Sequence, residues 1–310
     1  MRILRHPEEW TAAGGGPVSL ALGVFDGVHR GHQEVIRRLL DQARASNTSA
    51  IVATFDPHPA AVINPRRAPK LLQTLNQRLR TLQSLQPDAL WLIHFDETLS
   101  RLTGEEFVRQ CARGFGSIRS IHVGESFHFG HRRTGNITLL RHLAGALGFV
   151  ADAAPPVAWH GAPISSTRIR NAISQGDLRA AEALLGRPFA IAGTVVVGRR
   201  RGRTFGYPTA NLDVTGRALP PLGVYAGRAR RADASYPAVA NLGIQPTLAN
   251  VNPALQLEVH LLDFTGDLYG EELEFTVAAR LREERRFASI EELKAQIARD
   301  VQAARQHLDH

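Results

Sequence analysis

Short apolar runs alternate with amphipathic patterns in the first half of the chain. Four runs predict strands: VSLALGVF, AIVATF, ALWLIHF and SIRSIHVG. Helical spacing of apolar residues lies between them, at Leu71 to Leu85 and at Ile36, Leu39, Leu40 and Ala43. Strands that alternate with helices favour a parallel sheet with crossover helices, so we expect an α/β domain here.

Two further helical stretches, Thr167 to Ser174 and Leu178 to Leu185, close this half. Asp177 is a candidate N-cap of the second stretch and Gly186 a candidate C-cap. We therefore expect a domain boundary after Gly186, with one domain at 1–186 and another at 187–310.

The pattern changes to period two in the second half, where ALQLEVHLL and ELEFTVAARL alternate. In the first of these runs Leu257 and Val259 point one way, while Glu258 points the other. Several such strands, separated by Gly, Pro and Asp turns, predict an antiparallel barrel or sandwich. The chain then ends in one helix, for which Ser289 and Glu292 form a candidate capping box.

Composition narrows the class of protein. The 310 residues are 44% hydrophobic and 21% charged, which is typical of a globular protein. No apolar run approaches the roughly 20 residues of a membrane span, and the start lacks a hydrophobic signal segment, so we expect a cytoplasmic protein without a membrane partner. Cys111 is the only cysteine, which excludes an intramolecular disulfide framework and favours a reducing compartment.

The net charge of +8 comes almost entirely from arginine, because Lys70 and Lys294 are the only lysines. The chain therefore has no glycine-lysine phosphate loop, and a Schiff-base lysine is disfavoured. A basic chain can bind nucleic acid or small anions such as nucleotides. Since the arginines are scattered rather than gathered in a tail, we expect small anions and no nucleic acid.

The stretch GVFDGVHRGH, Gly23 to His32, joins an apolar strand to a helix. A helix N-terminus offers free amides and a favourable dipole to phosphate. Gly31 allows close backbone approach, and His29 and His32 lie one turn apart as hydrogen-bond donors. Two isolated histidines would more often be capping or surface residues, and no nearby acid or cysteine completes a metal site.

In this context, His-x-Gly-His resembles the signature of nucleotidyltransferases, which transfer an adenylyl or cytidylyl group from a nucleoside triphosphate. ISSTRIR, Ile164 to Arg170, resembles the second phosphate-binding stretch of that family. The resemblance implies a nucleotide site that includes Gly23, Phe25, Asp26, Gly31, Ser165, Ser166, Thr167 and Arg170.

Two more loops are expected at the carboxyl ends of parallel strands, where ligands of such sheets collect. They are TFDPHP, Thr54 to Pro59, and VGESFHFG, Val123 to Gly130. Phe127 and Phe129 could stack on a planar ring, with core packing as the alternative. A proline-stiffened loop is the alternative for TFDPHP.

GRRRGRTFGYPTANL, Gly198 to Leu212, resembles the signature of riboflavin kinases. From about residue 18 to 304 the chain resembles the bacterial bifunctional riboflavin kinase and FAD synthetase. This implies a Rossmann-like nucleotidyltransferase domain with a parallel sheet, then an antiparallel β-barrel kinase domain with a terminal helix. In the barrel it implies an ATP site at Gly198, Gly202, Arg203, Gly206 and Pro208, and Mg²⁺ ligands at Thr209 and Asn211.

The resemblance implies two reactions. The second half phosphorylates riboflavin to FMN with ATP, with Glu258 as general base, and the first half transfers AMP from ATP to FMN to give FAD. His29 and His32 are then the catalytic donors of the first half. Its flavin-binding residues are expected to be Asp56, Pro57, His58, Phe127 and Phe129.

The chain departs from this family where Asp, Arg and Asp are more frequent, at Ser126, His128 and Asn136. These positions leave a second hypothesis open, an active riboflavin kinase with a weakened or non-catalytic nucleotide-binding first domain. A third hypothesis, a basic flavin-dependent regulator or RNA-binding protein, rests on the charge and on GRRRGR. The sequence predicts no oligomeric state.

Overall fold

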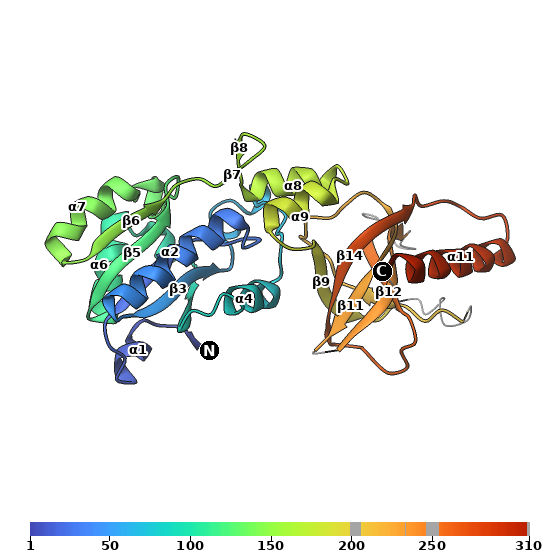
Figure 1. The fold of residues 1–310 in the computed structure, drawn as a ribbon, viewed down its shortest axis with the longest axis horizontal. Helices are drawn as coiled ribbons and strands as arrows, with labels where there is room; N and C mark the ends of the chain where they lie inside the picture. The colour runs from blue at the N-terminus through green and yellow to red at the C-terminus, as the bar shows by residue number, and fades with distance from the viewer. Residues whose placement is uncertain (199–205, 233, 246–253, 309–310) are drawn as a thin grey trace. The chain divides into compact units, whose positions relative to one another are not determined.

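The computed structural model describes the whole chain except residues 199–205, 233, 246–253 and 309–310 (Figure 1). The chain forms two compact units. The first contains Met1–Lys70 and Leu75–Arg168, and the second contains Leu71–Thr74 and Ile169–His310. The division between the units thus falls before the boundary expected at Gly186, which stays a prediction.

A six-stranded sheet forms the centre of the first unit, with the order β1-β4-β3-β2-β5-β6 and every neighbouring pair parallel. This confirms the predicted Rossmann-like architecture. The strands are β1 (Arg2–Leu4), β2 (Val18–Leu22), β3 (Ser49–Asp56), β4 (Ala89–His94), β5 (Ile118–Gly124) and β6 (Val150–Ala154).

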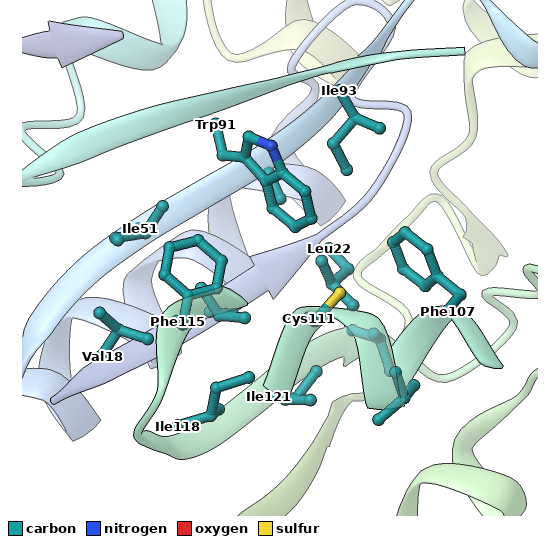
Figure 2. Close-up of a cluster of buried hydrophobic side chains, with 14 of the residues drawn as sticks. Val18, Leu22, Ile51, Trp91, Ile93, Phe107, Cys111, Phe115, Ile118 and Ile121 are labelled. Atoms are coloured by element: carbon teal, nitrogen blue, oxygen red, sulfur yellow. The ribbon is translucent and has the colours of Figure 1, made fainter. Parts of the chain in front are cut away.

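Helices cover both faces of this sheet, because alternate residues of the buried strands point to opposite sides. On β2, Ala21 packs with α2 (Arg30–Ser46) and α4 (Leu75–Gln83), whereas Leu20 and Leu22 belong to the core under α6 (Gly104–Phe115) and α7 (Ile137–Leu147). Figure 2 shows this second core, into which Cys111 points from α6. Burial raises the pKa of the Cys111 thiol, so it is core filler.

Shorter elements complete the first unit: α1 (Glu8–Ala12), α3 (Pro59–Ile63), η1 (Pro65–Arg67), α5 (Glu97–Arg101), η2 (His131–Arg133), β7 (Ala158–Trp159) and β8 (Ala162–Pro163). The helix expected from Leu71 begins only at Leu75. Leu71 itself belongs to the second unit, where its backbone donates to Gly216 O at 2.8 Å and accepts from Ala218 N at 2.9 Å.

The second unit is built on a closed antiparallel barrel with the order β10-β13-β12-β11-β14-β9. Closure removes the exposed edges of a sheet. This confirms the predicted barrel. Its strands are β9 (Ala190–Val196), β10 (Ala210–Leu212), β11 (Gly223–Arg231), β12 (Ala234–Gln245), β13 (Ala254–Leu261) and β14 (Glu272–Arg282).

Among the described residues, the helices that accompany the barrel strands are α8 (Ser166–Ser174), which begins in the first unit, α9 (Leu178–Leu185) and α11 (Ile290–Leu308). The caps predicted for α9 are present, since Asp177 accepts from Ala180 N and Gly186 is left-handed at φ 73°. The terminal helix packs Ala304 on barrel residues of β11 and β12. Its capping box is shifted, because Glu292 accepts from Ala288 N instead of Ser289 N.

Candidate active sites

The loop between β2 and α2 has an unusual backbone. Phe25, Gly27 and Val28 all have positive φ, at 51°, 84° and 38°. For the β-branched Val28 this conformation is strained, and such strain persists only where the surrounding structure enforces it. Gly23 contributes, because a Cβ there would lie 2.8 Å from the Phe25 ring that folds over it.

His29 and His32 lie together at the start of α2. His29 is the N-cap, and its Nδ1 accepts from the backbone N–H of His32 at 3.3 Å. The two rings stack at 3.6 Å, and His32 meets the edge of Phe25 at 5.2 Å. Because Nδ1 of His29 is an acceptor, its neutral ring carries the proton on Nε2. Capping and donation are therefore compatible, since the cap fixes which nitrogen can donate.

The ISSTRIR stretch meets this loop although about 130 residues separate them. Ser166 Oγ donates to Asp26 O at 2.9 Å, and a Cβ on Gly31 would lie 3.8 Å from Ile164 O. Ser165 Oγ accepts from Arg168 N at 3.2 Å, as an N-cap of α8 does. The structure thus brings two helix N-termini to one place. Thr167 follows in the first turn of α8.

Arg170 lies further along α8, in the second unit.

Arg78 of α4 is a residue that the sequence analysis missed. It is 5% exposed, and its guanidinium donates from Nη2 to Phe55 O at 2.7 Å and from Nη1 to Val24 O at 3.1 Å. Val24 precedes the strained loop and Phe55 lies in TFDPHP. A signal was present, since Arg78 lies on the same helical stripe as Leu75 and Leu82.

A cavity of about 580 Å³ opens in the first unit, within the usual range for small-molecule sites. Phe127 and Phe129 line it, with ring centres 5.7 Å apart and planes at 19°. Phe129 also packs on Phe107 in the core, whereas Phe127 is only half-buried. Its lining includes Arg101, His131, Arg132 and Arg133, together with Glu97, which pairs with Arg101 at 3.4 Å.

The TFDPHP loop reaches this cavity through Phe55 and Pro59. Asp56, Pro57 and His58 are not among the described residues that line it. Asp56 O accepts from Phe95 N at 3.0 Å, and His58 caps α3 by accepting from Ala60 N at 3.1 Å. In the structure, these contacts fix the path of the loop.

The three family departures have distinct surroundings. Asn136 is the N-cap of α7, with Oδ1 accepting from Leu139 N at 3.0 Å, a contact that Asn and Asp both make. His128 lines the cavity, with Nδ1 2.8 Å from Ser126 O and 3.1 Å from Arg133 Nη2. The substitution at Asn136 therefore preserves a local structural role.

In the second unit, strand register places Asn211, Glu258 and Asn241 in one row. Glu258 of β13 is directly opposite Asn211 of β10 and directly opposite Asn241 of β12. Residues opposite one another share a face of the sheet, with Cβ atoms about 5 Å apart. Asn241 was not singled out from the sequence.

Asn211 is 6% exposed, and its Oδ1 is buried with no hydrogen-bond partner among the described residues. A Cβ on Gly198 would overlap its amide, so only glycine fits there. Thr209 lies two residues before Asn211, directly before β10 begins at Ala210. An amide oxygen and a hydroxyl are suitable ligands for Mg²⁺, and the described residues hold no cluster of three His, Cys, Asp or Glu that would compete.

The turn that carries Thr209 is fixed from β13. His260 Nδ1 lies 2.7 Å from Pro208 O, and the His260 ring meets Tyr207 edge-on at 5.5 Å. Pro208 and Thr209 line a cavity of about 270 Å³. Gly206 begins the turn at φ 84°. Gly202 and Arg203, also expected at the ATP site, lie outside the described residues.

Comparison with known proteins shows which family the chain belongs to. Residues 15–168 match the FAD synthetase family model, and residues 185–308 match the riboflavin kinase model. The chain belongs to the bifunctional riboflavin kinase/FMN adenylyltransferase family. This confirms the family resemblance. The matches to both domains of this family support the bifunctional interpretation over a kinase with a non-catalytic first domain.

Two relatives in the bifunctional family show the extent of the likeness. The Pseudomonas fluorescens protein is 42% identical over 285 residues, covering 92% of this chain and 91% of its own. The Escherichia coli K12 protein is 38% identical over 307 residues, covering 99% of this chain and 97% of its own.

A crystal structure from Streptococcus pneumoniae, titled a macrolide-efflux protein, has 31% identity and a TM-score of 0.80, and the match covers 98% of both chains.

In the described part of this chain, no helix combines the length and apolar character of a membrane span.

Proposed function

We propose that the barrel of the second unit transfers the γ-phosphate of ATP to riboflavin, and that the first unit transfers AMP from another ATP to the FMN so formed. The products are FMN and ADP in the first reaction, and FAD and pyrophosphate in the second. Two features support the proposal: the stacked histidines at the start of α2, and Asn211 directly opposite Glu258 in the barrel.

In the kinase reaction, Glu258 accepts the proton of the terminal ribityl hydroxyl as that oxygen attacks the γ-phosphate. Its place opposite Asn211 supports this role, because base and phosphate ligand must reach the same reacting group. Thr209 and Asn211 would hold Mg²⁺, which supplies charge neutralisation at the phosphates when bound. Gly198, Gly206 and Pro208 would border the triphosphate. Gly202 and Arg203 are proposed for the same site from the sequence and lie outside the described residues.

In the adenylyl transfer, a phosphate oxygen of FMN attacks the α-phosphorus of ATP, and the bond to the β-phosphate breaks. This nucleophile is already ionised at neutral pH, so no general base is required. His29 Nε2–H, His32 and the N-terminus of α2 stabilise the charge that develops at the α-phosphate. Ser165, Ser166, Thr167 and Arg170 hold the departing pyrophosphate, while Gly23, Phe25, Asp26 and Gly31 shape the loop.

The aromatic cavity of the first unit takes the flavin ring of FMN. Its volume and the nearly parallel rings of Phe127 and Phe129 suit a flat aromatic ligand. The arginines in its lining suit the phosphate. Asp56, Pro57 and His58 contribute by holding the neighbouring loop. We place both reactions in the cytoplasm, with riboflavin, FMN, FAD and ATP as the partners.

One assay tests this function. The pure chain is incubated with riboflavin, ATP and Mg²⁺, and the flavins are separated by chromatography. We expect FMN to appear first and FAD to follow. FMN without FAD would contradict the adenylyl transfer, and no conversion would contradict both reactions. Omitting Mg²⁺ in the presence of a chelator is expected to stop FMN formation.

A further inference from the structure

We infer that Arg78 is a positioning residue for adenylyl transfer, which holds the loop from Val24 to His29 in its strained conformation through the carbonyl of Val24. The inference rests on the adenylyl transfer proposed above. Arg78 does not belong to any of the sequence motifs that suggested the site, because it lies on α4.

Two hydrogen bonds hold the start of the loop at Val24, and we call this pair of contacts the clamp. The Val24 carbonyl accepts two hydrogen bonds, from Arg78 Nη1 at 3.1 Å and from Thr54 Oγ1 at 2.9 Å. The peptide that follows leads directly into Phe25 at φ 51°, the first of the three left-handed residues. Because a strained loop needs external contacts to persist, these two donors at its entrance determine whether it keeps this path.

The same guanidinium also fixes the end of β3 through Phe55 O, at 2.7 Å. Val24 and Phe55 both line the aromatic cavity. One rigid, planar group therefore links the loop that carries His29 with the loop that borders the proposed flavin site. A lysine could supply the charge, but not two donors in a fixed fork.

Burial of a charge without a strong structural reason is unfavourable. Desolvation lowers the pKa of Arg78, and the nearby carboxylates of Asp26 and Asp56 oppose that effect. Nε of Arg78 is buried with no partner among the described residues. The chain thus keeps a costly arginine at the carboxyl ends of β2 and β3, where a neutral apolar residue would complete the stripe of α4.

The test compares Arg78→Lys and Arg78→Met with Arg113→Met, which changes an exposed arginine on α6. Loss of the clamp displaces the loop, so kcat for FAD formation from FMN should fall on the order of 10²-fold in Arg78→Met. We expect a smaller fall, about 10-fold, in Arg78→Lys, with KM for ATP nearly unchanged in both. FMN formation and the Arg113→Met variant should match wild type.

A wild-type kcat in folded Arg78→Met would overturn the inference, as would a rise in KM for ATP at constant kcat, which marks a phosphate-binding arginine. If Arg78→Met does not fold, the test rests on Arg78→Lys. A wild-type kcat for FAD formation in Arg78→Lys would then overturn the inference.

Hydrogen exchange separates this inference from the proposed function. The Val28 amide donates to Phe25 O at 3.1 Å and the His32 amide to His29 Nδ1 at 3.3 Å. Both amides should exchange about 10-fold faster or more in Arg78→Lys, whether or not the chain makes FAD. Unchanged exchange would overturn the positioning role. Absence of FAD from the wild type would overturn only the proposed function.

Discussion

Asn211 and Glu258 stand directly opposite each other on β10 and β13, and the Oδ1 atom of Asn211 is buried with no hydrogen-bond partner among the described residues. A buried amide oxygen in this state is costly unless a ligand satisfies it. Asn211 lies beside Glu258, the only carboxylate of this three-residue row, and we propose that the two residues act as cation ligand and base of the kinase reaction.

Asn211→Leu should therefore lower the affinity of the kinase site for Mg²⁺. The variant keeps a similar volume but loses the oxygen, so FMN formation should fall at least about 10-fold, and the Mg²⁺ concentration for half-maximal rate should rise. Asn211→Asp keeps an oxygen at this position and should retain more activity than Asn211→Leu. A Mg²⁺ titration of FMN formation checks both. An unchanged titration curve in Asn211→Leu would contradict the ligand role.

We expect substitution of Phe127 to affect FMN binding and substitution of Phe129 to affect the stability of the first unit. Phe127 is half-buried at the cavity, so Phe127→Ala should raise KM for FMN roughly 3- to 10-fold, the scale of one lost aromatic contact. Phe129 is 7% exposed and belongs to the core, so Phe129→Ala should lower the free energy of unfolding by about 3–5 kcal/mol.

Tryptophan fluorescence measures the stability of the first unit alone, since Trp10, Trp91 and Trp159 are the three tryptophans of the chain and all lie there. Steady-state kinetics of FAD formation measures KM. Equal KM values for wild type and Phe127→Ala would contradict the stacking role of Phe127.

Asn136 should behave as a helix cap. Asn136→Asp keeps the acceptor for Leu139 N, so stability and FAD formation should be close to wild type. Asn136→Ala should lower the free energy of unfolding of the first unit by about 1 kcal/mol. Urea unfolding followed by tryptophan fluorescence checks this. A large gain of FAD formation in Asn136→Asp would show instead that the family aspartate acts in catalysis.

The spacing of hydrophobic residues was sufficient to predict the parallel sheet and the antiparallel barrel. Hydrophobic residues recur on the buried side of a helix or strand, so their spacing indicates which element forms. The α9 caps followed equally directly from Asp177 and Gly186, since capping is local chemistry. The start of α4 did not, because Leu71 makes its backbone pairs with Gly216 and Ala218, far along the chain. Local spacing contains no information on such pairings.

In the candidate sites too, local sequence motifs predicted some residues, whereas others are brought in only by tertiary structure. Motifs located the histidines, Ser165, Asn211 and Glu258, because phosphate chemistry requires those residue types at short spacing. Arg78 and Asn241 reach their sites through tertiary packing and strand register, which no local motif encodes. The stacking of His29 on His32, and the capping that selects its tautomer, likewise required the structure.

A partly buried polar network connects α2 to the sheet. Asp152 accepts from Arg38 at 2.6 and 2.7 Å and from His122 Nδ1 at 3.1 Å, and His122 Nε2 lies 2.9 Å from Ser120 Oγ. Burial lowers the pKa of His122 below its usual 6.5, against the opposing effect of Asp152. His122 is 3% exposed, so the folded chain holds it neutral and it accepts from Ser120.

This network should make the first unit acid-sensitive. As the pH falls through 6.5, the unfolded chain takes up the His122 proton before the folded chain does, so the free energy of unfolding decreases. The pKa of Asp152 is lowered by its hydrogen bond to Arg38, so its contribution is lost only below about pH 4.

His122→Gln should therefore flatten the pH dependence between about pH 7 and 5, by up to ~1.4 kcal/mol per pH unit. Urea unfolding at several pH values, followed by tryptophan fluorescence, checks this. Parallel curves for wild type and variant would exclude His122 as the titrating group.

The central claim is that two separate sites each use ATP, and the most direct measurement is the rate of each half reaction in Glu258→Gln and His32→Ala. We expect Glu258→Gln to lose roughly 10²-fold or more in FMN formation while converting supplied FMN to FAD at the wild-type rate. His32→Ala should lose on the order of 10²-fold in FAD formation with FMN formation unchanged. If either variant lowered both rates equally, or neither rate, the account of two independent sites would be contradicted.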